Sequence, residues 1–433
     1  QKASAFVGNL MGNSTLTVNK CAVTNSTFSA YFMVAPIASY GATTQVKVNG
    51  IQLKNNTINV VEQASQTYSY DETMRAEYWG DDLNASTTTV FYDTTMPLVS
   101  VAELDGYGFV NLGDAITAAE TGDTITLLSD VAVDTTITVD KNVTINLNGY
   151  TITGVSRSGD SAIGRRVFYV TKGTLNLTGE GTVTTADKND ETFKDSSSVI
   201  RVGDGSDYAK TESLETAGLV IGSDVTISAP ASYGVGAFGG DTKETLDVYG
   251  KVISTSSASA VSGNGQDINS DTTINIHDGA VITAEKAVAI YHPQAGAMTI
   301  GAATITGTGG IEAKAGSTTV TVDGATITAT GEVDHTANSD GTSTDGYAIA
   351  AVENDDYAGN ATIRIENGHF IGPVAVLTDN PVVENKDATI EISGGNFSEP
   401  VNKEYLADAI SAELYSLRNT ATPYSYYPSV EEA

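Results

Sequence analysis

Residues 273–283 read TINIHDGAVIT: a short run of alternating apolar residues, a glycine and a second short apolar run. The pattern is Thr, apolar, any residue, apolar, a Gly two or three positions later, then an apolar residue three positions after that Gly. It recurs as TINLNGYTIT (144–153), TLDVYGKVIS (245–254), TVTVDGATIT (319–328), TIRIENGHFI (362–371) and TIEISGGNF (389–397). A self-similar phrase of this kind is the sequence signature of a solenoid.

Each copy predicts two short strands joined by a bend. Alternating apolar residues give a strand one buried face, and the glycine permits bend angles that a side chain would block. Weaker apolar runs between the copies, at 167–170, 287–290 and 348–352, supply a third strand per period. We therefore predict an all-β parallel β-helix, in which stacked rungs share one core. A leucine-rich repeat is excluded because its Leu/Asn phrase is absent.

Composition agrees with a turn-rich β protein and limits the partners. The 433 residues include 43 Gly and 9 Pro, with 7% aromatics, and the formal net charge is −31. Such an acidic surface repels nucleic acid and anionic membranes, so we expect neither as a partner. No run of about 18 apolar residues is present, so we expect no membrane insertion. The single cysteine, Cys21, excludes an internal disulfide.

The repeats and the breaks between them divide the chain. Helical spacing of apolar residues predicts short capping helices on either side of the main body, the first beginning at Asn111 and ending at Gly122. Because the chain starts at Gln1 without Met, we expect it to be part of a longer protein. The predicted segments are β-helix-like rungs (1–60), an aromatic and acidic insertion or linker (61–100), a capping-helix region (101–123), the main β-helix (124–400), a second capping helix (401–418) and a tail (419–433).

Two longer phrases resemble a known family. Residues 108–153, GFVNLGDAITAAETGDTITLLSDVAVDTTITVDKNVTINLNGYTIT, resemble a recurrent opening of surface proteins from gut Firmicutes that carry a pectate-lyase-like right-handed parallel β-helix. Residues 388–408, ATIEISGGNFSEPVNKEYLAD, resemble the closing phrase of these modules. The resemblance covers roughly residues 100–410. It implies a right-handed coil within a large, wall-associated, multi-domain protein of a group mostly without assigned activity.

Both ends of the chain qualify the resemblance. Relatives often continue the closing phrase with Gly, whereas Asp408 is followed here by Ala409, so the end of the module differs. Residues 1–60 are similar to Gly-rich adhesin repeats that open with F-V-G, here Phe6-Val7-Gly8.

Two groups of residues are candidates for ligand binding. Tyr78 and Trp79 lie in an aromatic, acidic stretch, where rings either stack on sugar faces or pack a hairpin against its scaffold. Arg165 and Arg166 lie one rung before Arg201, near Asp204 and Asp207. A lyase-like site would need such a cation beside clustered acids that hold calcium. The alternative is a set of solvated loop ion pairs.

Metal and catalytic signatures are sparse. The acidic loop 338–346, with Asp340 and Asp345, is a candidate for calcium, although its spacing is not that of an EF-hand. Residues 354–356 with His369 loosely echo a polygalacturonase, but their spacings are too short. His277, His292 and His335 are isolated and show no zinc spacing. We therefore assign no catalytic residue, no metal ligand and no cofactor, with calcium as an open alternative.

These observations favour a non-catalytic extracellular bacterial surface protein whose β-helical scaffold presents loops for adhesion or recognition. Its expected partner is a host or cell-wall glycan or protein, and its expected location is the cell surface, through a longer parent chain. One alternative is a polysaccharide lyase or glycosidase acting in a groove of the β-helix. Another is a tailspike-like or filament subunit, for which a stable trimer is the test. The oligomeric state is left open.

Overall fold

The structure is almost entirely β and forms two compact units, residues 1–130 and 131–433. The computed structural model describes residues 2–7, 13–30, 33–35, 46–54, 57–60, 100–155, 166–186, 198–203, 215–237, 242–263, 272–292, 295–314, 318–338, 341–352, 360–379, 388–408, 410, 412–415 and 420–428. The insertion or linker expected at 61–100 lies outside these residues, apart from Ser100.

The first unit begins with two rungs. Three parallel pairs join strands about 30 residues apart in the chain: β1 with β4, β2 with β5, and β3 with β6. Residues 1–60 are the segment for which β-helix-like rungs are predicted. The strands are β1 (Lys2–Ser4), β2 (Leu16–Thr24), β3 (Thr27–Ala30), β4 (Met33–Ala35), β5 (Val46–Lys54) and β6 (Thr57–Val60).

The first unit ends in an antiparallel segment with one helix. Strand β7 (Ala102–Leu104) pairs antiparallel with β8 (Tyr107–Phe109) and β9 (Thr124–Leu127), and helix α2 (Leu112–Ala118) lies between β8 and β9 in the chain. The predicted N-cap is present, because the Asn111 side chain accepts a hydrogen bond from the Asp114 amide at 3.2 Å. The helix ends at Ala118 with Ala119 as its C-cap, rather than at Gly122, which turns the chain with φ +95°. Its capping role over later rungs stays a prediction.

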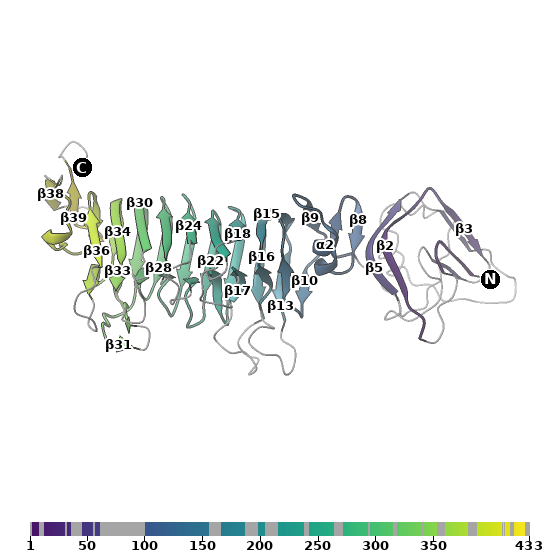
Figure 1. The fold of residues 1–433 in the computed structure, drawn as a ribbon, viewed down its shortest axis with the longest axis horizontal. Helices are drawn as coiled ribbons and strands as arrows, with labels where there is room; N and C mark the ends of the chain where they lie inside the picture. The colour runs from purple at the N-terminus through teal and green to yellow at the C-terminus, as the bar shows by residue number, and fades with distance from the viewer. Residues whose placement is uncertain are drawn as a thin grey trace. The chain divides into compact units, whose positions relative to one another are not determined.

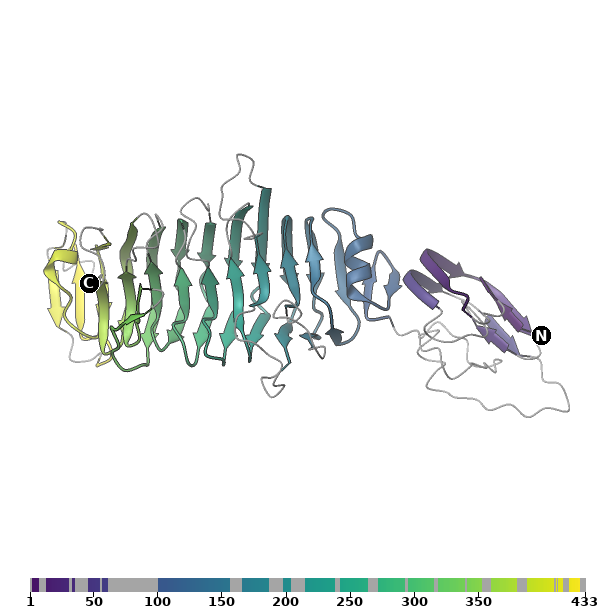
Figure 2. The same ribbon diagram turned by 60° about the horizontal axis from the view of Figure 1, so that its bottom comes forward.

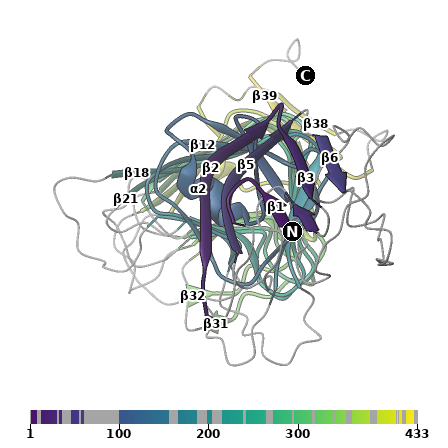
Figure 3. The same ribbon diagram turned by 90° about the vertical axis from the view of Figure 1, so that its right-hand side faces the viewer.

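The second unit is a parallel β-helix, as predicted. Its strands follow one another in sequence order along the stack in Figures 1 and 2, and Figure 3 looks along that stack so that successive rungs lie behind one another. Each complete rung contributes one strand to each of three parallel ladders, and the last rung, formed by β36 and β37, has described strands in the first two only. Within the described residues, the third ladder is a separate nine-stranded sheet.

The ladders have the following strands. The first ladder contains β12 (Val143–Asn146), β15 (Gly173–Thr178), β18 (Glu215–Ile221), β21 (Thr242–Val248), β24 (Thr272–Ile276), β27 (Gly296–Ile300), the first halves of β30 (Thr318–Ala329) and β34 (Ala361–Ile371), and β36 (Thr389–Ile392). The second contains β10 (Val131–Val133), β13 (Thr151–Gly154), β16 (Gly181–Thr185), β19 (Val225–Ala229), β22 (Lys251–Ser254), β25 (Val281–Ala284), β28 (Thr304–Gly307), the second halves of β30 and β34, and β37 (Gly395–Phe397). The third contains β11 (Ile137–Val139), β14 (Phe168–Val170), β17 (Ser198–Val202), β20 (Tyr233–Ala237), β23 (Val261–Gly263), β26 (Ile290–His292), β29 (Ile311–Lys314), β33 (Tyr347–Val352) and β35 (Val374–Asp379).

The core of this unit consists of aliphatic side chains stacked in register. One inward apolar residue of each rung pairs with its counterpart in the next rung, and each is at most 1% exposed. Burying each such side chain contributes about 1.5–3 kcal/mol, so the stack supplies the main stabilising term. One continuous column is Ile145, Leu177, Ile221, Val248, Ile276, Ile300, Val322, Ile365 and Ile392.

The glycine of the phrase has different physical reasons in different rungs. Gly279 has φ +82°, and a Cβ there would meet nothing within 4 Å, so the backbone angle alone requires glycine. At Gly250 a Cβ would lie 2.3 Å from the carbonyl oxygen of Gly222 in the preceding rung. There, close approach of two rungs requires the glycine.

The C-terminal end corrects the expected capping helix at 401–418. The described residues there form a short 3₁₀ turn, η4 (Lys403–Tyr405), and strand β38 (Ala412–Tyr415). Residues of the expected tail form β39 (Tyr424–Tyr427), which pairs antiparallel with both β37 and β38. The last rung has an open strand edge, and a strand can satisfy its backbone groups whereas a helix cannot.

Aromatic packing holds this closing strand in place. The Tyr426 ring is 1% exposed and meets Phe397 edge-on with 5.8 Å between centroids. Phe397 stacks on Phe370 of the preceding rung at 4.9 Å. The end of the core is therefore covered by an aromatic cluster that belongs to the β-sheet.

Candidate functional site

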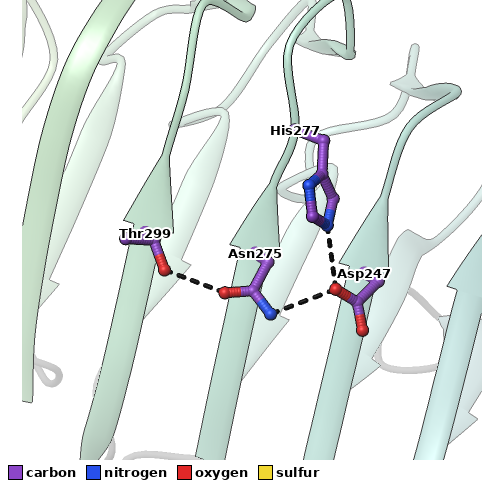
Figure 4. Close-up of polar contacts among 4 residues, drawn as sticks. All are labelled: Asp247, Asn275, His277 and Thr299. Carbon is purple, nitrogen blue, oxygen red and sulfur yellow. Dashed lines mark hydrogen bonds and ion pairs between the residues drawn. The ribbon is translucent and has the colours of Figure 1, made fainter.

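A chain of hydrogen bonds runs across the outer face of the first ladder. Asp247, Asn275 and Thr299 occupy matching outward positions on β21, β24 and β27. The Thr299 hydroxyl donates to Asn275 Oδ1 at 2.8 Å, and Asn275 Nδ2 donates to Asp247 Oδ1 at 3.0 Å (Figure 4). The parallel register places these side chains one strand apart, so the three rungs present a fixed polar row.

An imidazole and a phenol ring adjoin this row. His277 Nε2 lies 2.8 Å from Asp247 Oδ1 (Figure 4), and because a carboxylate only accepts, Nε2 carries the proton. The Tyr249 ring stacks on this imidazole, with 3.8 Å between centroids and 5° between planes. Tyr249 and His277 each follow the last inward residue of their strand, so adjacent rungs place the two rings together. We call Asp247, Tyr249, Asn275, His277 and Thr299 the polar ledge.

All residues of the polar ledge except Asp247 line an open hollow of about 490 Å³, which Ile276, Asp278 and Gly301 complete. Asp278 Oδ1 accepts a hydrogen bond from the Ala302 amide at 2.7 Å, which anchors this carboxylate. A Cβ at Gly301 would lie only 2.3 Å from that same oxygen. The absence of a side chain at Gly301 therefore lets the two rungs approach and keeps this side of the hollow clear.

The ledge combines an exposed aromatic ring with held polar groups. Tyr249 is 41% exposed, although its ring is supported on one face by His277. Amide, hydroxyl and carboxylate groups beside it offer both donors and acceptors. Within the described residues no group of three His, Cys, Asp or Glu could hold a metal ion. This arrangement suits the binding of a polar ligand that also has an apolar face.

Two of the arginines selected from the sequence meet on the third ladder. Tyr169 of β14 and Arg201 of β17 are register partners, and Arg166 lies two residues before the start of β14. The guanidinium carbons of Arg166 and Arg201 lie 5.4 Å and 5.3 Å from the centroid of the Tyr169 ring. Arg165, Asp204 and Asp207 lie outside the described residues. We call Arg166 and Arg201 the arginine pair.

The environment of Arg166 disfavours the protonated form of its side chain. The residue is 7% exposed, and its Nε has no hydrogen-bond partner in the described structure. Burial, followed by repulsion from Arg201, lowers the pKa of Arg166 to about 10, while Tyr169 acts in the opposite direction. Arg166 stays protonated at neutral pH.

The other candidates from the sequence do not form a described site. Tyr78, Trp79 and Asp340 lie outside the described residues. Asp345 Oδ1 accepts a short hydrogen bond of 2.5 Å from the Thr308 hydroxyl, which links it to the preceding rung. Calcium binding by Asp340 and Asp345 stays a prediction. His369 lies within β34, between its register partners Thr326 and Asn396, and its Nδ1 lies 3.1 Å from the Thr422 hydroxyl oxygen.

Sequence reasoning missed a buried ionic cluster on the third ladder. Lys314 Nζ lies 3.1 Å from Glu312 Oε1 and donates to the Tyr291 hydroxyl at 3.2 Å. The Thr344 hydroxyl donates to Glu312 Oε2 at 2.6 Å. The two charged side chains are only 1% and 6% exposed. The available signal was IEAK at 311–314, where charged residues alternate with apolar ones on the outward side of a strand.

Polar-ledge residues were also missed, because His277 was judged isolated. Its partner Asp247 is 30 residues away, and only the rung register brings them together.

Comparisons with family models, curated proteins and solved structures found no match to this chain. Among the described residues, no helix has the length and apolar character needed to cross a bilayer.

Proposed function

We propose that this chain is a non-catalytic recognition scaffold of an extracellular bacterial surface protein, and that its polar ledge binds carbohydrate. The exposed ring of Tyr249, backed by His277 and flanked by a hydrogen-bonded polar row, carries the proposal. A sugar presents an apolar C–H face to a ring and hydroxyl groups to neighbouring donors and acceptors. The resemblance of residues 108–153 to wall-associated modules supports the surface location.

The contacts of the two carboxylates favour binding over catalysis. Glycoside hydrolysis uses a pair of carboxyl groups, one as acid and one as base or nucleophile. Here Asp247 Oδ1 accepts from both Asn275 and His277, and Asp278 Oδ1 accepts from the Ala302 amide. Both carboxylates are therefore engaged by donors of the protein itself and orient the groups around them.

A lyase or glycosidase is the second candidate, and the arginine pair favours it. Arg166 and Arg201 share one face of the β-helix, which is the arrangement that a groove acting on acidic chains would require. A tailspike-like or filament subunit is the third candidate, and a stable trimer in solution would support it. The experiment therefore measures cleavage and oligomeric state together with binding.

The experiment titrates neutral oligosaccharides into the protein by calorimetry, with and without calcium, and assays the same mixtures for new reducing ends and unsaturated products. We expect at least one neutral glycan to bind without cleavage. Tyr249→Ala should weaken that binding by about tenfold, because it removes the stacking surface. Cleavage of any glycan would overturn the non-catalytic assignment.

A matched control separates the ledge from general loss of exposed apolar surface. Val333 is 49% exposed on a different rung, so Val333→Ala should bind as the unchanged protein does. Equal binding by Tyr249→Ala and Val333→Ala would exclude the polar ledge as the carbohydrate site.

A further inference from the structure

The arginine pair places two like charges around one aromatic ring. Both guanidinium carbons lie near the centroid of the Tyr169 ring, that of Arg166 at 5.4 Å and that of Arg201 at 5.3 Å. Each contact is a favourable cation–π interaction, yet the ring cannot remove the repulsion between two cations. Parallel pairing of β14 with β17 holds Tyr169 and Arg201 side by side, so the two charges cannot separate easily.

The Nε–H group of Arg166 has no hydrogen-bond acceptor among the described residues. Its backbone is held in the rung, because its carbonyl oxygen accepts from the Thr136 hydroxyl at 3.0 Å. Its side chain is more than nine-tenths buried, and Nε has no hydrogen-bond partner in the described structure. A buried guanidinium N–H without an acceptor costs free energy, which a bound acceptor would recover.

The neighbouring arginine is positioned to share such an acceptor. Arg201 donates from Nε to the Gly203 carbonyl oxygen at 3.3 Å, which fixes the position of its guanidinium group. Its next register partner on β20 is Gly236, which adds no side chain to the outward row. A ligand oxyanion beside Tyr169 would meet donors from both arginines and would cancel their mutual repulsion.

We infer that Arg166 and Arg201, which both lie beside the Tyr169 ring, form an oxyanion site that takes the carboxylate or sulfate of an acidic glycan. Planar guanidinium groups match these anions through paired N–H donors. The chain as a whole carries a net charge of −31, so its general field repels anions and only a local site can hold one. The choice of a glycan as the ligand rests on the recognition function proposed above, whereas anion binding itself does not depend on that function.

The test measures anion binding directly on the whole chain. Sodium sulfate and sodium acetate are titrated separately while the Arg166 Nε–H signal is followed by NMR. Sulfated and carboxylated oligosaccharides and an uncharged oligosaccharide are then compared by calorimetry at constant ionic strength. We expect sulfate or acetate to shift the Arg166 signal, and acidic but not uncharged oligosaccharides to bind at this site.

Variants distinguish a built site from general charge. Arg201→Gln should weaken binding of the acidic oligosaccharide by about tenfold, because it removes one charged donor. Arg364→Gln removes the same charge from an arginine with a 52% exposed side chain on the first ladder, and should change binding less than twofold. Equal weakening by both variants, or an Arg166 signal that no anion moves, would overturn the inference.

The experiments can reject carbohydrate binding at the polar ledge and anion binding at the arginine pair independently of each other. Tyr249→Ala should leave sulfate and acetate binding unchanged, since Tyr249 lies on a different ladder. A sulfate response without any glycan binding would keep the oxyanion site and remove its glycan. Binding of neutral glycans that Arg201→Gln leaves intact, together with no anion response, would keep the polar ledge alone.

Discussion

The Tyr249 ring lies flat against the His277 imidazole, with 3.8 Å between ring centroids and 5° between ring planes. The two residues belong to adjacent rungs, and Asp247 holds the imidazole through a 2.8 Å hydrogen bond. A ring supported in this way loses little further freedom when a ligand stacks on its other face, so the supporting contact lowers the entropic cost of binding.

The hollow beside the polar ledge should be sensitive to one methyl group. Gly301→Ala places a Cβ 2.3 Å from Asp278 Oδ1, so Asp278 must move and its bond to the Ala302 amide must weaken. We expect reduced glycan binding with a loss of unfolding free energy of about 1–3 kcal/mol. Calorimetry and urea denaturation measure the two effects.

Gly279→Ala is the matched control for this variant. It adds the same methyl group where nothing lies within 4 Å, so its cost of about 1 kcal/mol comes from the positive φ alone. Glycan binding should be kept. If Gly301→Ala binds as well as Gly279→Ala does, the hollow has no part in recognition.

Buried His292 should make the β-helix less stable in mild acid. Burial lowers the pKa of His292 from 6.5 to about 4, and neither ring nitrogen has a partner in the described structure. Between these two values the unfolded chain binds a proton that the folded chain does not, so stability falls as pH falls from about 6.5 to about 4. The loss from this residue is about 3 kcal/mol below that range and absent above it.

Urea denaturation at several pH values tests this prediction. His292→Leu should lose less stability than the unchanged protein does between pH 7 and pH 4, because leucine binds no proton. His369→Gln serves as the control, since His369 is only part-buried and its Nδ1 lies near a hydroxyl oxygen. Parallel stability curves for His292→Leu and the unchanged protein would show that other groups cause the acid sensitivity.

The Glu312–Lys314 pair should behave as one energetic unit. Their side chains are 6% and 1% exposed, so removing one charge leaves the other buried without its partner. We expect Glu312→Gln or Lys314→Met alone to cost about 3–5 kcal/mol, and the double variant clearly less than the sum of the two. Denaturation of the three variants forms a double-mutant cycle, and strictly additive losses would contradict the coupling.

The aromatic C-terminal closure should keep the last rung from pairing with other molecules. Tyr426→Ala removes a ring that packs on Phe397 and loosens β39, with an expected loss of about 3–5 kcal/mol. The edge of β37 then becomes available for pairing between chains. Light scattering should detect self-association that Tyr424→Ala, a substitution at a less buried position of the same strand, does not cause.

The rung phrase predicted the strands and their buried faces well, because this information is local. The alternation of Ile274 and Ile276 with polar residues indicates which side of the strand faces the core, and the structure confirms that both residues are buried. The N-cap at Asn111 is local in the same way. The helix prediction for 401–418 was wrong because the apolar spacing of this segment, considered alone, fits a helix. An open strand edge on the last rung outweighed that preference.

The sequence by itself determined that this protein is a stack of short β-strands with an aliphatic interior, because a period-2 pattern repeated in every rung leaves no other way to bury those side chains. Only the tertiary structure decided which outward residues meet. Asp247 with His277, and Tyr169 with Arg201, lie about 30 residues apart in the chain, and the parallel register of neighbouring rungs brings them into contact. That register depends on the lengths and bends of the turns between strands, so the chemistry of both sites is a property of the stacked rungs.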